Sequence, residues 1–452
     1  MPAAAAPEVN VPALIDQQKI SAFQIRVAFL CAAVVFMDGF DAQAIGYVAP
    51  TLSKAWNLKP GELGPVFGAG LFGLMLGALA FSPVADRIGR KPVIILCTLW
   101  FGVASFLTVT AESTASLLAW RFITGLGLGG AMPNPIALTC EYAPQRSRAT
   151  MIMVMFVGFS LGSAVGGAIA AQLVPFLGWQ SVFWIGGIFP ILLAPILMFW
   201  LPESIRLLSL KGTRDESVAG ILAAINPALK FAPGTRFVAP EEHPEGFPVR
   251  HLFTEGRAAA TMLIWVMFFT NLLVIYFCAT WLPTVINNTG VSVRLAVIAT
   301  ALFQVGGIVG TLVLAVLIER FGAYRVLAGA YFAAAILIAA VGQAGSAIEL
   351  IIPAVFGAGF CVVGAQIGAN AMTATLYPTF IRSTGVGWAL GIGRIGSIIG
   401  PVLGGIMLSL QWHIPTIFVA GAIPVLIACG AAFALGRLPK SAAQPAAAIP
   451  AT

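Results

Sequence analysis

Hydrophobic residues occur in long runs along most of this chain. An α-helix rises about 1.5 Å per residue, so about twenty apolar residues in a row can cross the hydrocarbon core of a bilayer. Runs of this length predict twelve transmembrane helices, at residues 26–48, 65–84, 91–111, 116–139, 149–173, 179–201, 258–282, 295–318, 325–345, 347–374, 384–409 and 413–436.

Polar sequence divides the predicted helices into two sets of six, because residues 202–257 form the one long polar segment between spans. The expected organisation is a cytoplasmic leader at 1–25, a first bundle at 26–201, a central cytoplasmic loop at 202–257, a second bundle at 258–438 and a disordered tail at 439–452. We also expect the Ala/Pro-rich stretch Met1 to Val11 to be disordered. In the central loop, Thr213 and Glu216 have capping-box spacing, which predicts a short amphipathic helix ending at Asn226.

Composition excludes an ordinary soluble enzyme. Of the 452 residues, 59% are hydrophobic and 9% are charged, whereas soluble domains carry roughly 25% charged residues. The net charge of +7 does not indicate nucleic-acid binding, because 19 of the 24 Lys and Arg residues fall on one side of the predicted helices, together with the N-terminus. The positive-inside rule then predicts that both termini are cytoplasmic. We expect a multi-pass membrane protein.

Chemistry-bearing residues are scattered. The six cysteines lie in or at the ends of apolar runs, without the spacing of a disulfide framework or a metal site. His243 and His251 lie in the polar central loop and His413 at the outer edge of the twelfth span, so they offer neither a metal cluster nor a catalytic dyad. We therefore expect no metal, no cofactor and no enzymatic activity.

An internal repeat relates the two halves. Asp86-Arg87-Ile88-Gly89 recurs as Glu319-Arg320-Phe321-Gly322, at an offset of 233 residues. Glu141-Tyr142-Ala143-Pro144, followed by Arg146 and Arg148, corresponds to Leu376-Tyr377-Pro378, followed by Arg382. Two parallel six-helix repeats are typical of transporters that rock around a central site.

The stretch Ala85-Asp86-Arg87-Ile88-Gly89-Arg90-Lys91 resembles the signature loop of the major facilitator superfamily, although Ser82 stands where that loop usually begins with Gly. Pro202-Glu203-Ser204 and Arg121, with its neighbouring glycines, support the resemblance. Asp38-Gly39-Phe40-Asp41 is similar to the first-helix motif of the aromatic acid:proton symporters, which import compounds such as 4-hydroxybenzoate, protocatechuate and benzoate.

The resemblance implies an all-α membrane protein with twelve transmembrane helices in two pseudo-symmetric six-helix bundles. It implies a secondary transporter that uses the proton gradient to import a small aromatic carboxylate by alternating access. We expect it to function as a monomer in the inner membrane of a bacterium. The alternatives are a major facilitator carrier of another organic acid and an exporter.

Asp38 and Asp41 are the predicted proton-coupling residues. A carboxylate within the hydrocarbon costs roughly 2.5–3.5 kcal/mol on insertion scales and persists where it faces a cavity or a partner. Their spacing places both on one helix face near the middle of the first span. The alternative is that they pair with basic residues and hold helices together.

Arg394 is the predicted partner of the substrate carboxylate, because a guanidinium presents a planar fork and stays charged when buried. Its alternative role is an interhelical tie. Other polar or aromatic residues within spans are candidates for contact with an aromatic acid, or equally for interhelical contacts: Asn134, Tyr276, Trp281, Gln304, Gln366, Asn370 and Trp388.

Charged residues at helix ends on the predicted cytoplasmic face are candidates for a gate, since ion pairs there can form in one conformation and break in another. Arg121 is grouped with them, although its place on the fourth span fits proton coupling and structure equally. The gating candidates are Asp86, Arg87, Gly89, Arg90, Lys91, Arg121, Glu141, Arg148, Glu319, Arg320 and Arg382.

Overall fold

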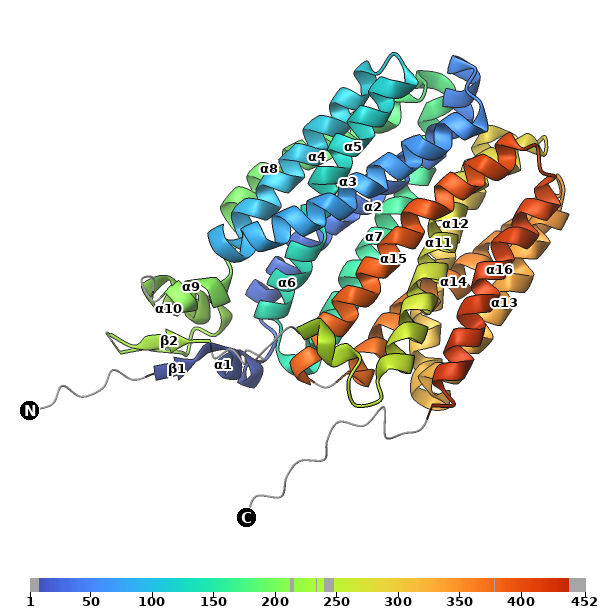
Figure 1. Ribbon diagram of the computed structural model, residues 1–452. Helices are drawn as coiled ribbons and strands as arrows, with labels where there is room; N and C mark the ends of the chain where they lie inside the picture. The colour runs from blue at the N-terminus through green and yellow to red at the C-terminus, as the bar shows by residue number, and fades with distance from the viewer. Residues whose placement is uncertain (1–7, 212–214, 233, 240–247, 378, 439–452) are drawn as a thin grey trace, which may run out of the picture. The chain divides into compact units, whose positions relative to one another are not determined.

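A computed structural model describes residues 8–211, 215–232, 234–239, 248–377 and 379–438. The described chain is almost entirely helical (Figure 1). Eleven of its helices are long and apolar enough to cross a membrane. The long helices are α2 (Ala22–Trp56), α3 (Pro60–Ile88), α4 (Arg90–Leu107), α5 (Thr114–Ala131), α7 (Gln145–Leu177), α8 (Gln180–Trp200), α11 (Ala258–Asn288), α12 (Val293–Phe321), α13 (Ala323–Gln343), α14 (Ile348–Leu376), α15 (Thr379–Ser409) and α16 (Ile414–Leu435).

The span predicted at 116–139 is interrupted. It consists of α5 and a short helix α6 (Pro133–Tyr142), which meet at Met132. Pro133 and Pro135 have no backbone N–H to continue the α5 hydrogen-bond ladder, so the helix breaks here. Arg121 also lowers the apolar character of α5. These two features explain why this span differs from the other eleven.

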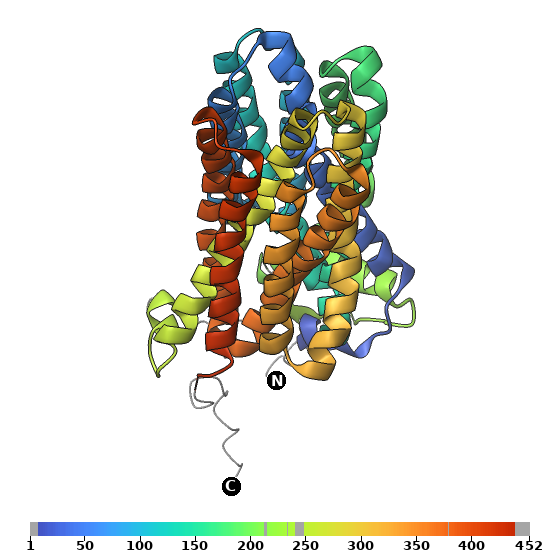
Figure 2. The ribbon, with the colours of Figure 1, turned by 90° about the vertical axis from the view of Figure 1, so that its right-hand side faces the viewer.

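The chain forms two compact units. Unit 1 comprises Met1–Ala42, Phe72–Gly162 and Phe183–Glu241, and unit 2 comprises Gln43–Leu71, Ser163–Val182 and Glu242–Thr452. In unit 2, α11 packs against α15 and α16, while α12 packs against α14 and α13 against α14 and α16. Figure 2 shows these C-terminal helices, in yellow to red, running side by side.

Close packing of α12 on α14 depends on glycines, which have no side chain. A Cβ added to Gly306 would lie 2.1 Å from the carbonyl oxygen of Phe356, and one added to Gly359 would lie 1.9 Å from that of Phe303. The two backbones therefore touch, as small residues allow in membrane helix pairs.

In unit 1, short elements gather beyond the ends of the long helices: β1 (Glu8–Asn10), α1 (Val11–Gln17), α9 (Ile205–Lys211), α10 (Asp215–Ile225) and β2 (Arg236–Val238) (Figure 1). The 3-10 turn Thr108–Thr110 follows α4 in this unit, and a second one, Pro248–Leu252, precedes α11 in unit 2.

Strand β1 pairs in parallel with β2, with Glu8 opposite Arg236 and Asn10 opposite Val238. The expectation of disorder for Met1 to Val11 is therefore wrong for residues 8–11, because the central segment supplies a strand partner and a hydrophobic surface. Residues 1–7 and the tail at 439–452 lie outside the described part of the chain. Helix α10 confirms the short helix predicted in the central loop, although Thr213 is not among the described residues.

The repeated Gly89 and Gly322 occupy equivalent turns. Helix α3 ends at Ile88, and Gly89 follows with φ +123°; helix α12 ends at Phe321, and Gly322 follows with φ +87°. Positive φ of this kind is essentially restricted to glycine. The sequence repeat thus corresponds to a repeated turn between consecutive long helices.

Candidate functional site

A charged group lies in the interior of unit 1, where three helices meet. Arg121 Nη1 of α5 contacts Asp41 Oδ2 of α2 at 2.9 Å, and Arg121 Nη2 donates to the Asp41 carbonyl oxygen at 3.2 Å. From α4, the Ser105 hydroxyl donates to Asp41 Oδ1 at 2.5 Å. Asp41 is 0% exposed and Arg121 is 3% exposed. The pair is fully desolvated, so breaking it would leave an uncompensated charge.

Asp38 lies one helical turn before Asp41 and is also 0% exposed. Between the two, Gly39 allows α2 to touch α7: a Cβ at Gly39 would lie 2.0 Å from the Phe159 carbonyl oxygen. The Phe183 ring lies 5.7 Å from the Arg121 guanidinium carbon and covers it. Both carboxyl groups are therefore enclosed in a tightly packed part of unit 1.

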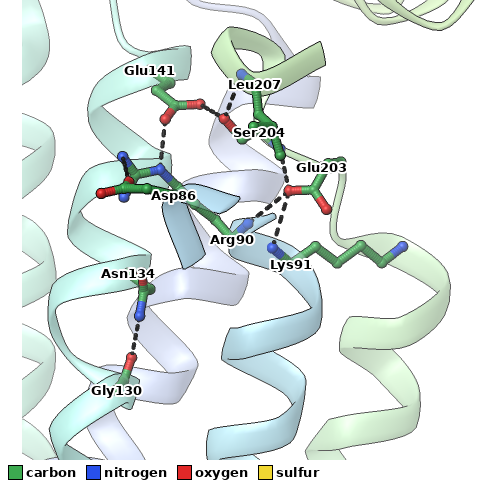
Figure 3. A network of polar contacts seen from close by, with 9 residues as sticks. All are labelled: Asp86, Arg90, Lys91, Gly130, Asn134, Glu141, Glu203, Ser204 and Leu207. Atoms are coloured by element: carbon green, nitrogen blue, oxygen red, sulfur yellow. Dashed lines mark hydrogen bonds and ion pairs between the residues drawn. The ribbon is translucent and has the colours of Figure 1, made fainter. Parts of the chain in front are cut away.

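A second polar network joins α4, α6 and the start of α9 (Figure 3). Arg90 Nε donates to Glu141 Oε1 at 2.7 Å, and the Ser204 hydroxyl donates to Glu141 Oε2 at 2.6 Å. Arg90 also lies 3.5 Å from the exposed carboxylate of Asp86. Glu141 thus has a partner for each carboxylate oxygen.

Glu203 extends the same network to the α3–α4 turn. Its Oε1 accepts the backbone N–H groups of Arg90 at 2.9 Å, Lys91 at 3.2 Å and Ser204 at 2.7 Å. An acidic side chain at this position satisfies amides at the start of α4 and complements the helix dipole. A Cβ at Gly89 would lie 2.3 Å from the Glu203 carboxylate, so a larger residue here would displace the end of that side chain in addition to straining φ.

Several polar side chains inside unit 2 join its helices, and Arg394 is one of them. Arg394 of α15 donates from Nη1 to the Tyr276 hydroxyl of α11 at 3.1 Å. Asn271 of α11 donates to Gln366 Oε1 of α14 at 2.8 Å, and Gln366 donates to Asn370 at 3.2 Å. Arg394–Tyr276 and Asn271–Gln366 are therefore interhelical pairs, whereas Gln366 and Asn370 bond each other within α14. Asn271 was not among the predicted substrate contacts.

The remaining predicted substrate contacts are dispersed. Trp281 is 1% exposed, and its indole N–H donates to the Pro401 carbonyl oxygen at 2.8 Å. Trp388 stacks on Trp265, with ring centroids 5.8 Å apart. Asn134 donates to the Gly130 carbonyl oxygen at 2.9 Å (Figure 3), and Gln304 is buried on α12.

Several gating candidates lie outside the Glu141 network. Arg121 belongs to the Asp41 pair, and Arg148 is half-buried at the start of α7. Arg87, Glu319 and Arg320 are exposed. Arg382 lies in α15, and its side chain is not among the described ones.

Ser105, Glu203, Ser204 and Asn271 were not among the site residues predicted from sequence. Ser105 gave no signal, because a serine in an apolar helix usually bonds its own backbone. Glu203 and Ser204 did have a sequence signal, since they belong to the Pro202-Glu203-Ser204 motif. Among the described residues, no group of three or more His, Cys, Asp or Glu side chains could hold a metal ion.

The helices and buried polar groups define a multispanning membrane transporter, and comparison with known proteins gives its family. The model of the Major Facilitator Superfamily matches residues 31–339 and again 264–451, and the chain belongs to this family. The resemblance seen in the sequence is thereby confirmed, and the family is one of transporters, not enzymes.

Two curated relatives match over nearly the whole chain. The gallate transporter of Pseudomonas putida is 40% identical, with 95% of each chain covered. The 4-hydroxybenzoate transporter PcaK of Pseudomonas aeruginosa is 38% identical, covering 95% of this chain and 96% of that one. Among solved structures, a bacterial homologue of the human lysosomal transporter Spinster, inward-facing and occupied, matches with a TM-score of 0.74 at 18% identity, covering 95% and 100% of the two chains.

Proposed function

We propose that this protein takes up a small hydroxylated aromatic carboxylate, such as 4-hydroxybenzoate or gallate, together with protons. The observation that carries the proposal is the 40% identity to a gallate transporter over 95% of both chains. The relatives transport gallate and 4-hydroxybenzoate, which share a carboxylate and a ring hydroxyl group. The proton gradient supplies the energy, and no cofactor takes part.

The proton site is Asp41, with Asp38 beside it. Moving a monoanion inward against a membrane potential costs about 2.3 kcal/mol per charge at 100 mV, so co-transported protons must offset the charge. Arg121 and Ser105 support this role, because together they contact both carboxylate oxygens of Asp41. When Asp41 takes up a proton, Arg121 loses its counter-ion, and the helices that the pair joins can rearrange.

The substrate carboxylate binds Arg394. Tyr276 accepts one N–H of the guanidinium and so restrains its orientation, and the planar fork of a guanidinium suits a carboxylate. The Tyr276 hydroxyl hydrogen is free to donate when its oxygen accepts from Arg394. Tyr276 can therefore serve both as a support for Arg394 and as a donor to the acid.

The Arg90–Glu141 network acts as part of a gate on the cytoplasmic side. We place both termini in the cytoplasm and the protein in the bacterial inner membrane, because the basic residues gather on that side. The α5–α6 pair forms the twelfth span. One chain is sufficient for transport, which proceeds by alternating access.

Uptake into proteoliposomes tests the proposed function. Purified protein is reconstituted with an alkaline interior, the voltage is clamped with potassium and valinomycin, and labelled 4-hydroxybenzoate is added outside. We expect accumulation that an uncoupler abolishes and that protein-free liposomes do not show. Uptake that is indifferent to the pH gradient would exclude proton coupling, and preferential efflux would favour an exporter.

A further inference from the structure

The N-terminal segment Glu8–Gln18 folds onto the central segment of unit 1, and the proposed transport cycle assigns it no role. We refer to this segment as the clasp. Its strand β1 pairs with β2, more than 220 residues away in the sequence (Glu8 opposite Arg236). A two-stranded sheet alone is marginally stable in water. Other contacts must hold the clasp in place.

Hydrophobic burial supplies one set of contacts. Val11 and Ile15 of α1 are 1% and 2% exposed. They belong to one core cluster with residues of α10 and β2, namely Val218, Leu222, Ile225 and Phe237. The same cluster continues into Val27, Leu30 and Val34 of α2. The clasp therefore shares the hydrophobic core of unit 1.

Hydrogen bonds join the clasp to the start of α7. Gln145 is the first residue of α7, and the preceding Pro144 has no side-chain acceptor with which to cap it. The Asp16 carboxylate fills this role by accepting the Gln145 N–H at 2.7 Å. The Arg146 guanidinium donates to the carbonyl oxygens of Asp16 at 3.1 Å and Gln18 at 2.6 Å.

A further hydrogen bond reaches the segment after α10. The Gln18 side-chain oxygen accepts from Asn226 at 2.7 Å. The clasp thus bridges two parts of unit 1 that are distant in sequence: the start of α7 and the central segment.

The turn that Asp16 holds also borders the Glu141 network. Only Ala143 and Pro144 separate the end of α6 from Gln145. Before the turn, Tyr142 donates to the Glu203 carbonyl oxygen at 2.6 Å, and Glu141 contacts Arg90. Fraying of the first turn of α7 would release this connection and with it the geometry of the Arg90–Glu141 pair.

We infer that the clasp is a fixed part of unit 1 and that Asp16 is a positioning residue for transport. By capping α7, Asp16 holds the α6–α7 turn in the position where Glu141 meets Arg90. The inference rests on the proposed uptake activity, because the rate of uptake is one of its measures.

The test compares Asp16→Ala with Asp16→Asn and with the matched control Gln17→Ala, an exposed neighbour on α1. Uptake of labelled 4-hydroxybenzoate is measured per amount of reconstituted protein. Losing one helix cap destabilises the helix by about 1 kcal/mol, which is about fivefold in an equilibrium constant. For Asp16→Ala we therefore expect the maximal rate to fall about fivefold, with KM within about twofold of the parent value. Asp16→Asn should keep at least about half of the rate, because the amide oxygen accepts the same hydrogen bond. Gln17→Ala should match the parent.

A parental rate in Asp16→Ala would overturn the inference. So would equal losses in Asp16→Ala and Gln17→Ala, equal losses in Asp16→Ala and Asp16→Asn, or a change in KM alone.

A second measurement does not depend on the stability of the Asp16 variants. Glu8 and Arg236, which are exposed and lie opposite each other, are both replaced by cysteine (Glu8→Cys, Arg236→Cys). A short bismaleimide then crosslinks the two cysteines, and each single variant treated in the same way is a control. We expect efficient linkage and uptake equal to that of the treated single variants. Failure to link would contradict the position of the clasp, and linkage that blocks uptake would contradict its being fixed. If the parent takes up no aromatic acid, the proposed function fails, while the linkage yield still tests the clasp.

Discussion

The interiors of the two units differ in charge. Unit 1 buries Asp38, Asp41 and Arg121. In unit 2, each Asp or Glu that the structure describes is exposed, namely Glu62, Glu255, Glu319 and Glu349. The polar groups inside unit 2 are amides and hydroxyl groups, with Arg394 beside Tyr276 and the buried Arg257 paired with the exposed Glu255. The two units thus bury different charged groups, because the buried carboxylates of the described residues all lie in unit 1. The proposed proton site belongs to unit 1, and the proposed anion site belongs to unit 2.

The repeated turns show the same asymmetry. Gly89 and Gly322 both have positive φ, but the space around them differs. A Cβ at Gly89 meets the Glu203 carboxylate, whereas no neighbour among the described residues lies within 4 Å of a Cβ at Gly322. The backbone turn is repeated, while the acidic side chain packed against it belongs to unit 1.

The largest effect is expected from removing the titratable group. Asp41→Asn should abolish accumulation driven by a pH gradient, because an amide cannot take up a proton at this pH. Substrate exchange across the membrane should persist, since it needs no net proton movement. Accumulation and exchange in proteoliposomes are measured in parallel, and persisting exchange shows that the variant is folded. Full gradient-driven accumulation in the Asp38→Asn, Asp41→Asn double variant would move the proton site elsewhere, with Glu141 the next candidate.

The next effect concerns the anion site of unit 2. Arg394→Lys keeps the positive charge but loses the fork, and a hydrogen bond to a charged group contributes about 1.5–3 kcal/mol. We expect the affinity for 4-hydroxybenzoate to fall about 10- to 100-fold. Equilibrium binding by calorimetry on purified protein measures this directly. Parental affinity in the variant would show that Arg394 does not bind the carboxylate through its fork.

An effect of intermediate size is expected at the two glycine turns, which can be compared in matched variants. Gly89→Ala and Gly322→Ala both place alanine at positive φ, which costs about 1–3 kcal/mol. Only Gly89→Ala also displaces the Glu203 carboxylate. The transport rate should therefore fall several-fold further in Gly89→Ala than in Gly322→Ala, with substrate affinity unchanged in both. Equal rates would mean that the Glu203 contact does not contribute to the gate.

The smallest effect is expected at Ser105. Ser105→Ala removes one neutral donor from Asp41 and leaves Arg121 in place. The Asp41 carboxylate then loses about 1–3 kcal/mol of stabilisation. The pH at which uptake is half-maximal should shift measurably, while KM for substrate stays unchanged. Thr108→Ala, which removes a hydroxyl bonded to a backbone carbonyl of the same region, is the control. An identical pH profile for parent and Ser105→Ala would separate Ser105 from proton coupling.

Much of the fold could be predicted from sequence, because bilayer thickness sets the length of each apolar run. The repeated Asp86–Gly89 and Glu319–Gly322 motifs also marked the two equivalent turns. The clasp could not be predicted: β1 and β2 are short, and their pairing depends on contacts between residues far apart in the chain. An Ala/Pro-rich start gave no sign that Val11 and Ile15 enter a core.

The site was partly predictable. Carboxylates and an arginine inside apolar runs are conspicuous, so Asp38, Asp41 and Arg394 stood out. The partner of Asp41 could not be identified from sequence. Spacing along a helix shows on which face a side chain lies, but not which residue of another helix lies opposite it. Arg121 was grouped with the gate for that reason, and the structure pairs it with Asp41.

The most direct test of the division between a titrating unit 1 and an anion-binding unit 2 is the proton movement that substrate induces in proteoliposomes. Adding 4-hydroxybenzoate outside should raise the external pH in the parent. Arg394→Lys should show the same ratio of protons to substrate but need about 10- to 100-fold more substrate. Asp41→Asn should exchange substrate without moving protons. Proton movement retained in Asp41→Asn, or lost at saturating substrate in Arg394→Lys, would contradict the account.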